Sequence, residues 1–499
     1  YVETELEMPW RKVLETVTAG GVHFAFDPPT QGAAVLIQSS DAATLDKFLG
    51  AVLDLAELDA KFNKKDEIRS GQYRGVKVYR VDRARFAVAD RWLVICNNDE
   101  LGKRIVDLHL DGGDATLARN EQFRAARKSI ADAPVVWAYV NVAALRDAGA
   151  AKDAFRGKSD NPVAELLAGG LLATAQHTPY LTLSGYLTPK QLRLVAAAPH
   201  EAAWAGEARE YFFGPRGQGV APPLLSPAGT ILSVSTHRDI AQMWLRADDL
   251  LDEKAVDQLA QADSNLSTLF AGKDFGEQIL GSFQPDVQIV AVRQDFADVL
   301  PRPAIKLPAA AIVFRLKEPE AMMPEMRRTF QSLVGFLNIV GAQQGQPPLD
   351  IDIDKADGLQ LVHASYVPTE DEKESTSARI NYNFSPTVAF AGDRFVIAST
   401  TALARQLGEA KPALARAKGA NANTELTLHA ATLREALADN RDQLVAQNML
   451  KEGHTREEAQ QQVDGLLAVL GVLHDASLSL DVTDSTVQLS AELNLNDVE

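Results

Sequence analysis

The sequence predicts an α+β protein built as a tandem duplication, in which each repeat is a mostly antiparallel sheet with helices packed on one face. Three observations lead to this prediction. Short apolar runs bounded by tight turns alternate with helical patterns along the chain. Several segments of the first half recur, in the same order, in the second half. A segment rich in glycine and proline separates the two halves.

The first repeat opens with two predicted strands and a helix. Residues 22–26 and 33–38 are apolar runs of strand length. A helix is predicted after them, because Asp41 is a suitable N-cap residue and apolar side chains then recur at intervals of three and four residues. These side chains are Leu45, Phe48, Leu49 and Val52.

The rest of the first repeat follows the same alternation. A strand is predicted at 76–81 and a hairpin at 85–95. Helices then precede a strand at 135–140, and a closing hairpin covers 180–197. Successive hairpins with helices between them favour antiparallel pairing, because parallel strands need a long crossover connection.

The duplication is clearest in a strand–turn–strand segment. Residues 86–95 read Phe-Ala-Val-Ala-Asp-Arg-Trp-Leu-Val-Ile, and residues 388–397 read Val-Ala-Phe-Ala-Gly-Asp-Arg-Phe-Val-Ile. Other pairs follow in the same order: 22–26 with 287–291, 33–37 with 310–314, 75–79 with 358–362, 141–146 with 429–434, and 187–194 with 482–489. Each match is short, but their common order is hard to reach by chance.

These matches divide the chain into three parts. Repeat one covers 1–213, a linker covers 214–227, and repeat two covers 228–499. The linker is assigned from its composition, because three glycines and four prolines in so short a stretch disfavour both helix and strand.

The second repeat begins earlier than the first. Its first strand at 230–236 and its first helix at 240–259 have counterparts that would precede Tyr1. We therefore expect about 35 further residues of fold upstream of the chain, together with an export signal. Without those residues, the first sheet would lack a strand or would borrow residues 230–236.

Composition and charge exclude several classes of partner. The chain has 50 Lys and Arg against 67 Asp and Glu, which gives a net charge of −17. Nucleic acids and anionic membranes are therefore not expected partners.

No apolar run reaches the roughly 18 residues of a membrane span. The single Cys96 excludes an internal disulfide. The sequence does not indicate an oligomeric state.

The motif search yields no metal or cofactor site. Asp350, Asp352 and Asp354 resemble the start of a calcium loop, but Lys355 and Leu361 occupy the positions that need Gly and Glu. Alternating Asp and Ile is instead typical of a strand with one solvated face. Zinc is not expected, because the chain lacks paired cysteines and closely spaced histidines.

One stretch has the residue types of a hydrolase. Ser233, Ser235 and His237 alternate along one predicted strand, with Asp239 as the local carboxylate. No turn suited to an oxyanion site is visible nearby. A strand edge followed by a helix N-terminus explains the same residues, so no catalytic residue is predicted. A single-copy hydrolase site near His237 and Asp239 remains an alternative.

Four segments together resemble a known class of proteins. They are Tyr-Arg-Gly-Val-Lys-Val-Tyr at 73–79, residues 86–95, Thr-Leu-Ala-Arg-Asn-Glu-Gln-Phe-Arg-Ala-Ala-Arg at 116–127, and Trp-Ala-Tyr-Val-Asn-Val at 137–142. Their order resembles uncharacterised, exported, two-repeat α+β bacterial proteins of the domain-of-unknown-function class. The resemblance implies a two-repeat architecture and an extracytoplasmic location, periplasmic or secreted. It implies no catalytic residue.

The fold is duplicated, but no constellation of reactive side chains is duplicated with it. We therefore expect a non-enzymatic extracytoplasmic interaction or scaffold protein. One alternative is a carrier of apolar, lipid-like small ligands in a cavity within or between the repeats. The other is the single-copy hydrolase. The expected partner is a protein or an apolar small ligand.

Overall fold

The computed structural model describes residues 2–63, 68–113, 116–130, 133–150, 152–155, 157–297, 299–356, 358–410 and 422–496. The chain forms two units. Unit one contains Tyr1–Ser129 and Ala144–Ala150, and unit two contains Ile130–Ala143 and Ala151–Glu499. Both are mixed α+β with antiparallel sheets, as the sequence predicts.

Unit one contains a six-stranded antiparallel sheet. Its strands, in spatial order, are β1 (Val22–Asp27), β2 (Gly32–Gln38), β6 (Trp92–Cys96), β5 (Ala84–Ala89), β4 (Val76–Val81) and β3 (Arg69–Tyr73). Its helices are α1 (Val2–Leu6), α2 (Trp10–Val17), α3 (Ala42–Asn63), α4 (Asp99–Asp111) and α5 (Glu121–Ser129). The predicted N-cap of α3 is confirmed, since an oxygen of Asp41 accepts from the Thr44 N–H at 2.7 Å.

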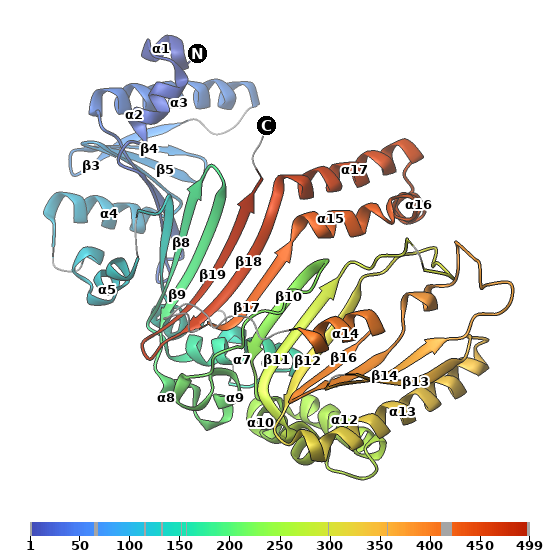
Figure 1. Ribbon diagram of the computed structural model, residues 1–499. Helices are drawn as coiled ribbons and strands as arrows, with labels where there is room; N and C mark the ends of the chain where they lie inside the picture. The colour runs from blue at the N-terminus through green and yellow to red at the C-terminus, as the bar shows by residue number, and fades with distance from the viewer. Residues whose placement is uncertain are drawn as a thin grey trace. The chain divides into compact units, whose positions relative to one another are not determined.

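Unit two contains a thirteen-stranded antiparallel sheet (Figure 1). Its strands, in spatial order, are β13 (Leu349–Ala356), β14 (Leu359–Tyr366), β15 (Thr387–Ala391), β16 (Arg394–Ala398), β12 (Ala309–Leu316), β11 (Phe283–Val292), β10 (Thr230–His237), β17 (Ala422–His429), β18 (Leu473–Val482), β19 (Thr486–Leu495), β9 (Gln191–Pro199), β8 (Tyr180–Thr188) and β7 (Val136–Asn141). The strand that precedes β11 in the chain, β10, pairs with both β11 and β17. It is therefore not borrowed by the sheet of unit one.

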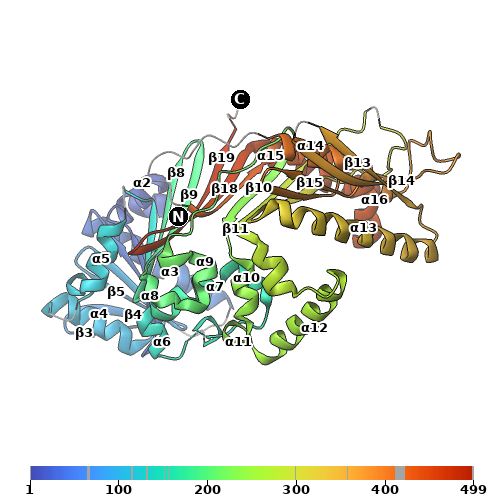
Figure 2. The same ribbon diagram turned by 60° about the horizontal axis from the view of Figure 1, so that its bottom comes forward.

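The helices connect these strands and cover the sheet of unit two. They are α7 (Pro162–His177), α8 (Ala202–Ala205), α9 (Glu210–Phe213), α10 (Ile240–Leu245), α11 (Ala247–Leu250), α12 (Glu253–Leu269), α13 (Pro319–Gln343), α14 (Thr401–Glu409), α15 (Ala430–Ala438), α16 (Arg441–Glu452) and α17 (Arg456–Val472). A further helix, α6 (Val142–Asp147), follows β7. Side chains of α7 and α9–α12 form one core with β18 and β19. The long helix α13 lies alongside β13 and β14 (Figure 2).

The prediction that helices cover only one face of each sheet is wrong. In unit two, Phe395 packs in the core that contains α13, whereas its neighbour Val396 packs in the core that contains α14. In unit one, Leu93 joins the core under α3, whereas Val94 joins the core under α4. Consecutive apolar residues on a strand point to opposite faces, so a continuous apolar run needs cover on both.

The glycine- and proline-rich segment lies in unit two and packs along β10. The hydroxyls of Ser233 and Ser235 donate to the carbonyls of Leu225 and Pro222, at 2.6 and 2.5 Å. The amide of Gln288 on β11 donates to the Pro223 carbonyl at 2.8 Å. Because proline has no N–H, Pro222 and Pro223 meet the sheet through their carbonyls.

Candidate functional site

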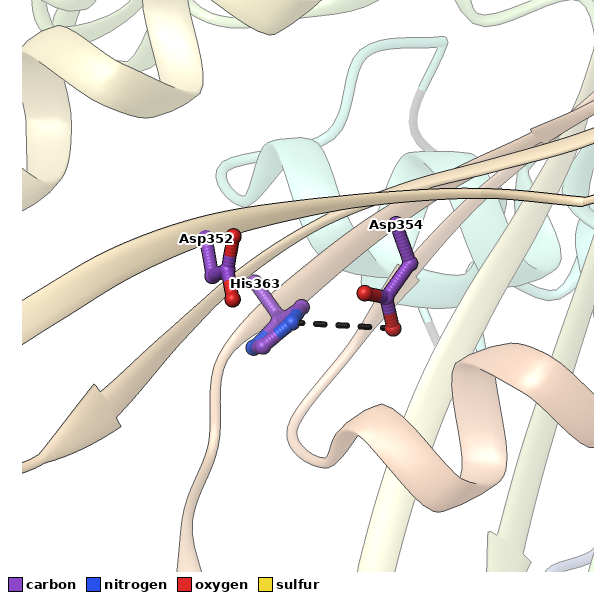
Figure 3. Close-up of side chains that lie close together, drawn as sticks. All are labelled: Asp352, Asp354 and His363. Carbon is purple, nitrogen blue, oxygen red and sulfur yellow. Dashed lines mark ion pairs between the residues drawn. The ribbon is translucent and has the colours of Figure 1, made fainter.

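Within the described part of the chain, one titratable cluster has the right residue types for a metal, and it lies on the hairpin of β13 and β14. Asp352 and Asp354 come from β13, and His363 of β14 stands directly opposite Asp352. One ligand atom from each residue lies within 4.8 Å of the others. Figure 3 shows the imidazole between the two carboxylates, with an ion pair of 3.8 Å from His363 Nε2 to Asp354. The prediction of a strand here, rather than a calcium loop, is confirmed.

An arginine already occupies part of this cluster. Arg405 of α14 donates to the same Asp354 oxygen at 2.8 Å. Asp352 accepts from the Ile353 N–H at 2.7 Å. A divalent cation would have to displace the arginine, and the other carboxylate is bound locally. The cluster is therefore better explained as an ion-pair network that ties α14 to the sheet.

The two serines and the aspartate of the hydrolase alternative have structural partners. Ser233 and Ser235 donate to backbone carbonyls. Asp239 caps α10 by accepting from the Gln242 N–H at 2.9 Å. His237 is buried, and burial lowers the pKa of its imidazole. Among the described residues no hydrogen bond joins His237 to Asp239 or to either serine, so these contacts do not support a hydrolytic site.

A buried ion pair joins α7 to the segment before α9. Glu165 is fully buried, and the Arg209 Nε donates to it at 2.8 Å. The Tyr211 hydroxyl donates to the Glu165 backbone carbonyl at 2.6 Å, and burial raises the pKa of this phenol. Because these groups are shielded from solvent, the network serves to fix α7 and not to meet a substrate.

Arg238 is a second buried charge in unit two. Its guanidinium lies 3.5 Å from the centre of the Phe212 ring and donates to the Asn423 side chain at 2.7 Å. Its Nε donates to the backbone carbonyl of Leu166 in α7 at 2.9 Å. Burial lowers the Arg238 pKa to about 9. The residue joins α7, α9, β10 and β17, which is a structural role.

Unit one contains an apolar pocket between its sheet and α4. The pocket has a volume of about 110 Å³, and its lining includes Tyr73, Val78, Phe86, Val94 and Val106. Pockets that enclose drug-sized or lipid-like ligands are larger, at about 300–1,000 Å³. This pocket does not supply the cavity that the carrier alternative requires.

An extended non-polar feature is a row of side chains that crosses the whole sheet of unit two. Directly opposed residues on paired strands point to the same face. One such set, which we call the apolar row, contains only apolar residues and one glycine. Its members, from β13 to β7, are Ile353, Val362, Val388, Ile397, Ile312, Ile289, Val234, Leu426, Leu478, Ala491, Leu194, Gly185 and Val136.

Helices cover the apolar row in some places and leave it exposed in others. Val362 and Val388 are buried in the core that contains α13. In the middle of the sheet, Ile312 is 39% exposed. Towards β7, Leu194 is 51% and Val136 is 63% exposed. Apolar side chains left exposed on a sheet face are typical of a surface that binds a partner.

On β18 and β19 the face opposite to the apolar row is polar, whereas on β11, β12 and β16 that opposite face is buried in the core that contains α14. On β18 and β19 the residues between the apolar ones are polar or charged: Asp475, Ser477, Ser479 and Asp481, and Gln488, Ser490, Glu492 and Asn494. An antiparallel sheet with this alternation has one face for water and one for a core or a partner. The apolar row therefore lies on the apolar face of these two strands, which is the face that a core or a partner covers.

Sequence reasoning missed both the carboxylate–imidazole cluster and the apolar row. The period-two patterns at Asp350–Asp354 and in the closing hairpins were available as signals. These local patterns do not indicate which strands pair when they lie far apart in the chain, as β9 and β19 do. Only that pairing aligns the separate apolar faces into one row.

Comparisons with known proteins give little further guidance. No family model and no curated protein matches the chain. Among solved structures, crystal forms IV, I and III of TP0453 align with TM-scores of 0.23, 0.24 and 0.21, each at 12% identity. They cover 40%, 40% and 38% of this chain and 70%, 67% and 64% of those chains. Similarity at this level assigns neither a fold family nor a function.

Proposed function

We propose that the protein is a non-enzymatic interaction or scaffold protein that acts outside the cytoplasm and binds a partner protein through the apolar row. The observation that carries the proposal is the exposure of part of that row, from Ile312 to Val136, on a sheet face whose reverse is polar at β18 and β19. In an ordinary soluble domain such a face is buried by helices or by a second sheet. A partner protein would supply the missing cover.

The reactive side chains of unit two support a non-catalytic role. Asp354 is paired with Arg405, and Glu165 with Arg209. Ser233 and Ser235 are bound to backbone carbonyls. A catalytic site needs a nucleophile or base that is free to meet substrate, and these contacts engage Asp354, Ser233 and Ser235.

We further propose that the chain is a tandem duplication. In unit one, a row of directly opposed residues contains Phe24, Val35, Ile95, Phe86 and Tyr79. The residues that match them in sequence are directly opposed in the same order in unit two: Ile289, Ile312, Ile397, Val388 and Val362. A one-residue slip in any strand would break this agreement, so its presence across five strands supports common descent.

The order of strands supports the duplication in the same way. The sheet of unit one runs β3–β4–β5–β6–β2–β1, and part of the larger sheet runs β13–β14–β15–β16–β12–β11. The strands β7–β8–β9 likewise correspond to β17–β18–β19.

An extracytoplasmic location is part of the proposal. Its support is the likeness of the segments at 73–79, 86–95, 116–127 and 137–142 to exported two-repeat proteins. Within the described residues, no helix combines the length and the apolar composition needed to span a bilayer.

The proposal is tested by charging the apolar row. Leu194→Lys places an ammonium group on the exposed part of the row, and Leu450→Lys does the same on α16, where the side chain is 88% exposed. Wild type and both variants are cross-linked in preparations from the source organism, and the attached proteins are identified by mass spectrometry. We expect one defined partner with wild type and Leu450→Lys, and its loss with Leu194→Lys.

Three outcomes would contradict the proposal. The first is a partner that Leu194→Lys retains at the wild-type level. The second is a lipid-sized adduct on the native protein in place of a protein partner, which would favour the carrier alternative. The third is turnover of a substrate that one substitution abolishes, which would favour an enzyme.

A further inference from the structure

The pocket between the sheet of unit one and α4 has an apolar floor. Figure 1 shows α4 on the side of this sheet that is opposite to α3. Three directly opposed side chains of β4, β5 and β6 line the pocket, namely Val78, Ala87 and Val94. Val106 of α4 lines it from the helix. Because the Ala87 side chain ends at its Cβ, a volume of about 110 Å³ stays open between sheet and helix.

The part of the pocket wall formed by Cys96 is uncharged. Its Sγ donates to the Asn98 carbonyl at 3.4 Å. Burial raises the pKa of this thiol, so it stays protonated at neutral pH. Gly102 of α4 lies so close to the thiol that a Cβ there would stand 2.8 Å from Sγ. This wall therefore suits an apolar group, because it offers a charged group no partner.

The two cationic side chains that line the pocket differ in what they bind. The Arg85 Nε donates to Asp99 at 2.6 Å, so these two charges neutralise each other. Lys103 of α4 is exposed, and its Nζ lies 5.8 Å from the centre of the Tyr73 ring. In the described part of the chain no carboxylate forms an ion pair with Lys103. An anion at this pocket would therefore meet a cation that lacks a carboxylate partner.

We propose that this pocket binds a small organic carboxylate, whose ring-sized apolar group lies on the floor around Ala87 and whose carboxylate pairs with Lys103. A closed apolar cavity of about 150 Å³ holds a benzene molecule. This pocket is smaller but opens to solvent, so a molecule of the size of benzoate fits with its carboxylate at the mouth. Apolar walls with one convergent charged group are the usual composition of a small-molecule site. The site lies within unit one and does not depend on the apolar row.

Two probes of similar shape test the apolar and the anionic halves of the site. Benzoate and benzyl alcohol are titrated into the 499-residue protein, and binding is followed by ligand-detected NMR. We expect both to bind, and benzoate to bind about two- to fivefold more tightly, which is the contribution of one exposed ion pair. Lys103→Gln should remove this difference and leave the affinity for benzyl alcohol unchanged. Lys12→Gln, at a lysine on α2 whose side chain is 64% exposed, is the matched control and should behave as wild type.

Two further measurements place the probes in this pocket. Ala87→Val adds two methyl groups to the floor and should abolish the binding of both probes, with circular dichroism to confirm that the variant is folded. The second measurement needs no substitution. Cys96 is the only cysteine of the chain, so its rate of alkylation by iodoacetamide reports on the pocket wall. Either probe should slow this alkylation in wild type, because a bound molecule covers the thiol.

Three results would overturn the proposal. The first is wild type that binds neither probe, which would make the space a packing gap only. The second is binding that a folded Ala87→Val variant retains, or, if that variant does not fold, a Cys96 alkylation rate that the probes leave unchanged. The third is a preference for benzoate that survives in Lys103→Gln. None of these results depends on the partner that Leu194→Lys tests, so failure of that proposal is recognised separately.

Discussion

Glu165 and Arg209 form a buried ion pair whose contribution to the stability of unit two can be measured. Glu165 has no exposed side-chain area, and Arg209 has little. Removing one charge leaves the other buried without its partner, which typically costs about 3–5 kcal/mol. We therefore expect Glu165→Gln to lower the free energy of unfolding by about that amount, measured by urea denaturation.

An exposed pair provides the control for this measurement. Glu207 is 83% exposed and bonds to Arg246 at 3.2 Å. Glu207→Gln should leave the free energy of unfolding close to the wild-type value, because water screens the pair. Equal losses in the two variants would show that burial does not decide the effect.

His200 makes the stability depend on pH. Its side chain is buried, and burial lowers the pKa of the imidazole from the ordinary 6.5. The unfolded chain therefore takes up a proton near pH 6.5, while the folded chain resists it until lower pH. Stability is fully present above about pH 6.5 and is lost as the pH falls below that value.

A substitution isolates this contribution. His200 lies 4.7 Å from the ring centre of Phe213, and the Thr174 hydroxyl that approaches His200 Nδ1 also donates to the Gly170 carbonyl. His200→Phe should therefore fold and should reduce the loss of stability between pH 7 and pH 5, followed by urea denaturation at each pH. An unchanged pH dependence in the variant would assign the effect elsewhere, for example to the buried His237.

At the scale of elements, substitution by alanine should change the stability of the protein in opposite directions at two helical glycines. A Cβ at Gly170 in α7 would lie 2.3 Å from the Phe212 ring, whereas a Cβ at Gly335 in α13 meets nothing within 4 Å. We expect Gly170→Ala to destabilise by about 1–3 kcal/mol through overpacking. Gly335→Ala should stabilise by about 0.5–1 kcal/mol through helix propensity. Thermal denaturation of both variants measures the difference, and shifts of the same sign would contradict the packing argument.

Much of the element order was predictable from local pattern. The hairpin predicted at 85–95 is present as β5 and β6, and its turn places Asp90 at a φ of 54°. Asp and Asn tolerate this conformation better than other residues with a side chain, which is why such turns are readable in a sequence. The helix after Asp41 is present for a similarly local reason, its N-cap.

Contacts between distant segments could not be predicted in the same way. His363 and Arg405 join Asp354 from a neighbouring strand and from α14, and no local pattern links these positions. The cover on both sheet faces was missed because an apolar run does not say what packs on either side. The candidate site therefore depended on pairing that only the structure supplies.

At the scale of the whole molecule, charge limits the choice of partners. A net charge of −17 repels polyanions unless a basic patch offsets it. We expect no retardation of duplex DNA and no binding to phosphatidylserine vesicles at about 0.15 M salt. Gel retardation and vesicle flotation measure the two. Binding that disappears at high salt would reveal a basic patch that the net charge conceals.

The pairing of β9 with β19 has a consequence for how the protein is made. Ala196 stands opposite Leu489, so 489 − 196 = 293 residues separate the partners in the chain. At about 5–20 residues per second, a ribosome needs about 15–60 seconds to produce the second strand after the first. During that time β9 lacks its partner strand β19, and the apolar face of the β8–β9 hairpin is uncovered. A nascent chain in this state is a natural client for a chaperone that holds extended apolar segments, and synthesis without one should yield aggregates before it yields the completed sheet.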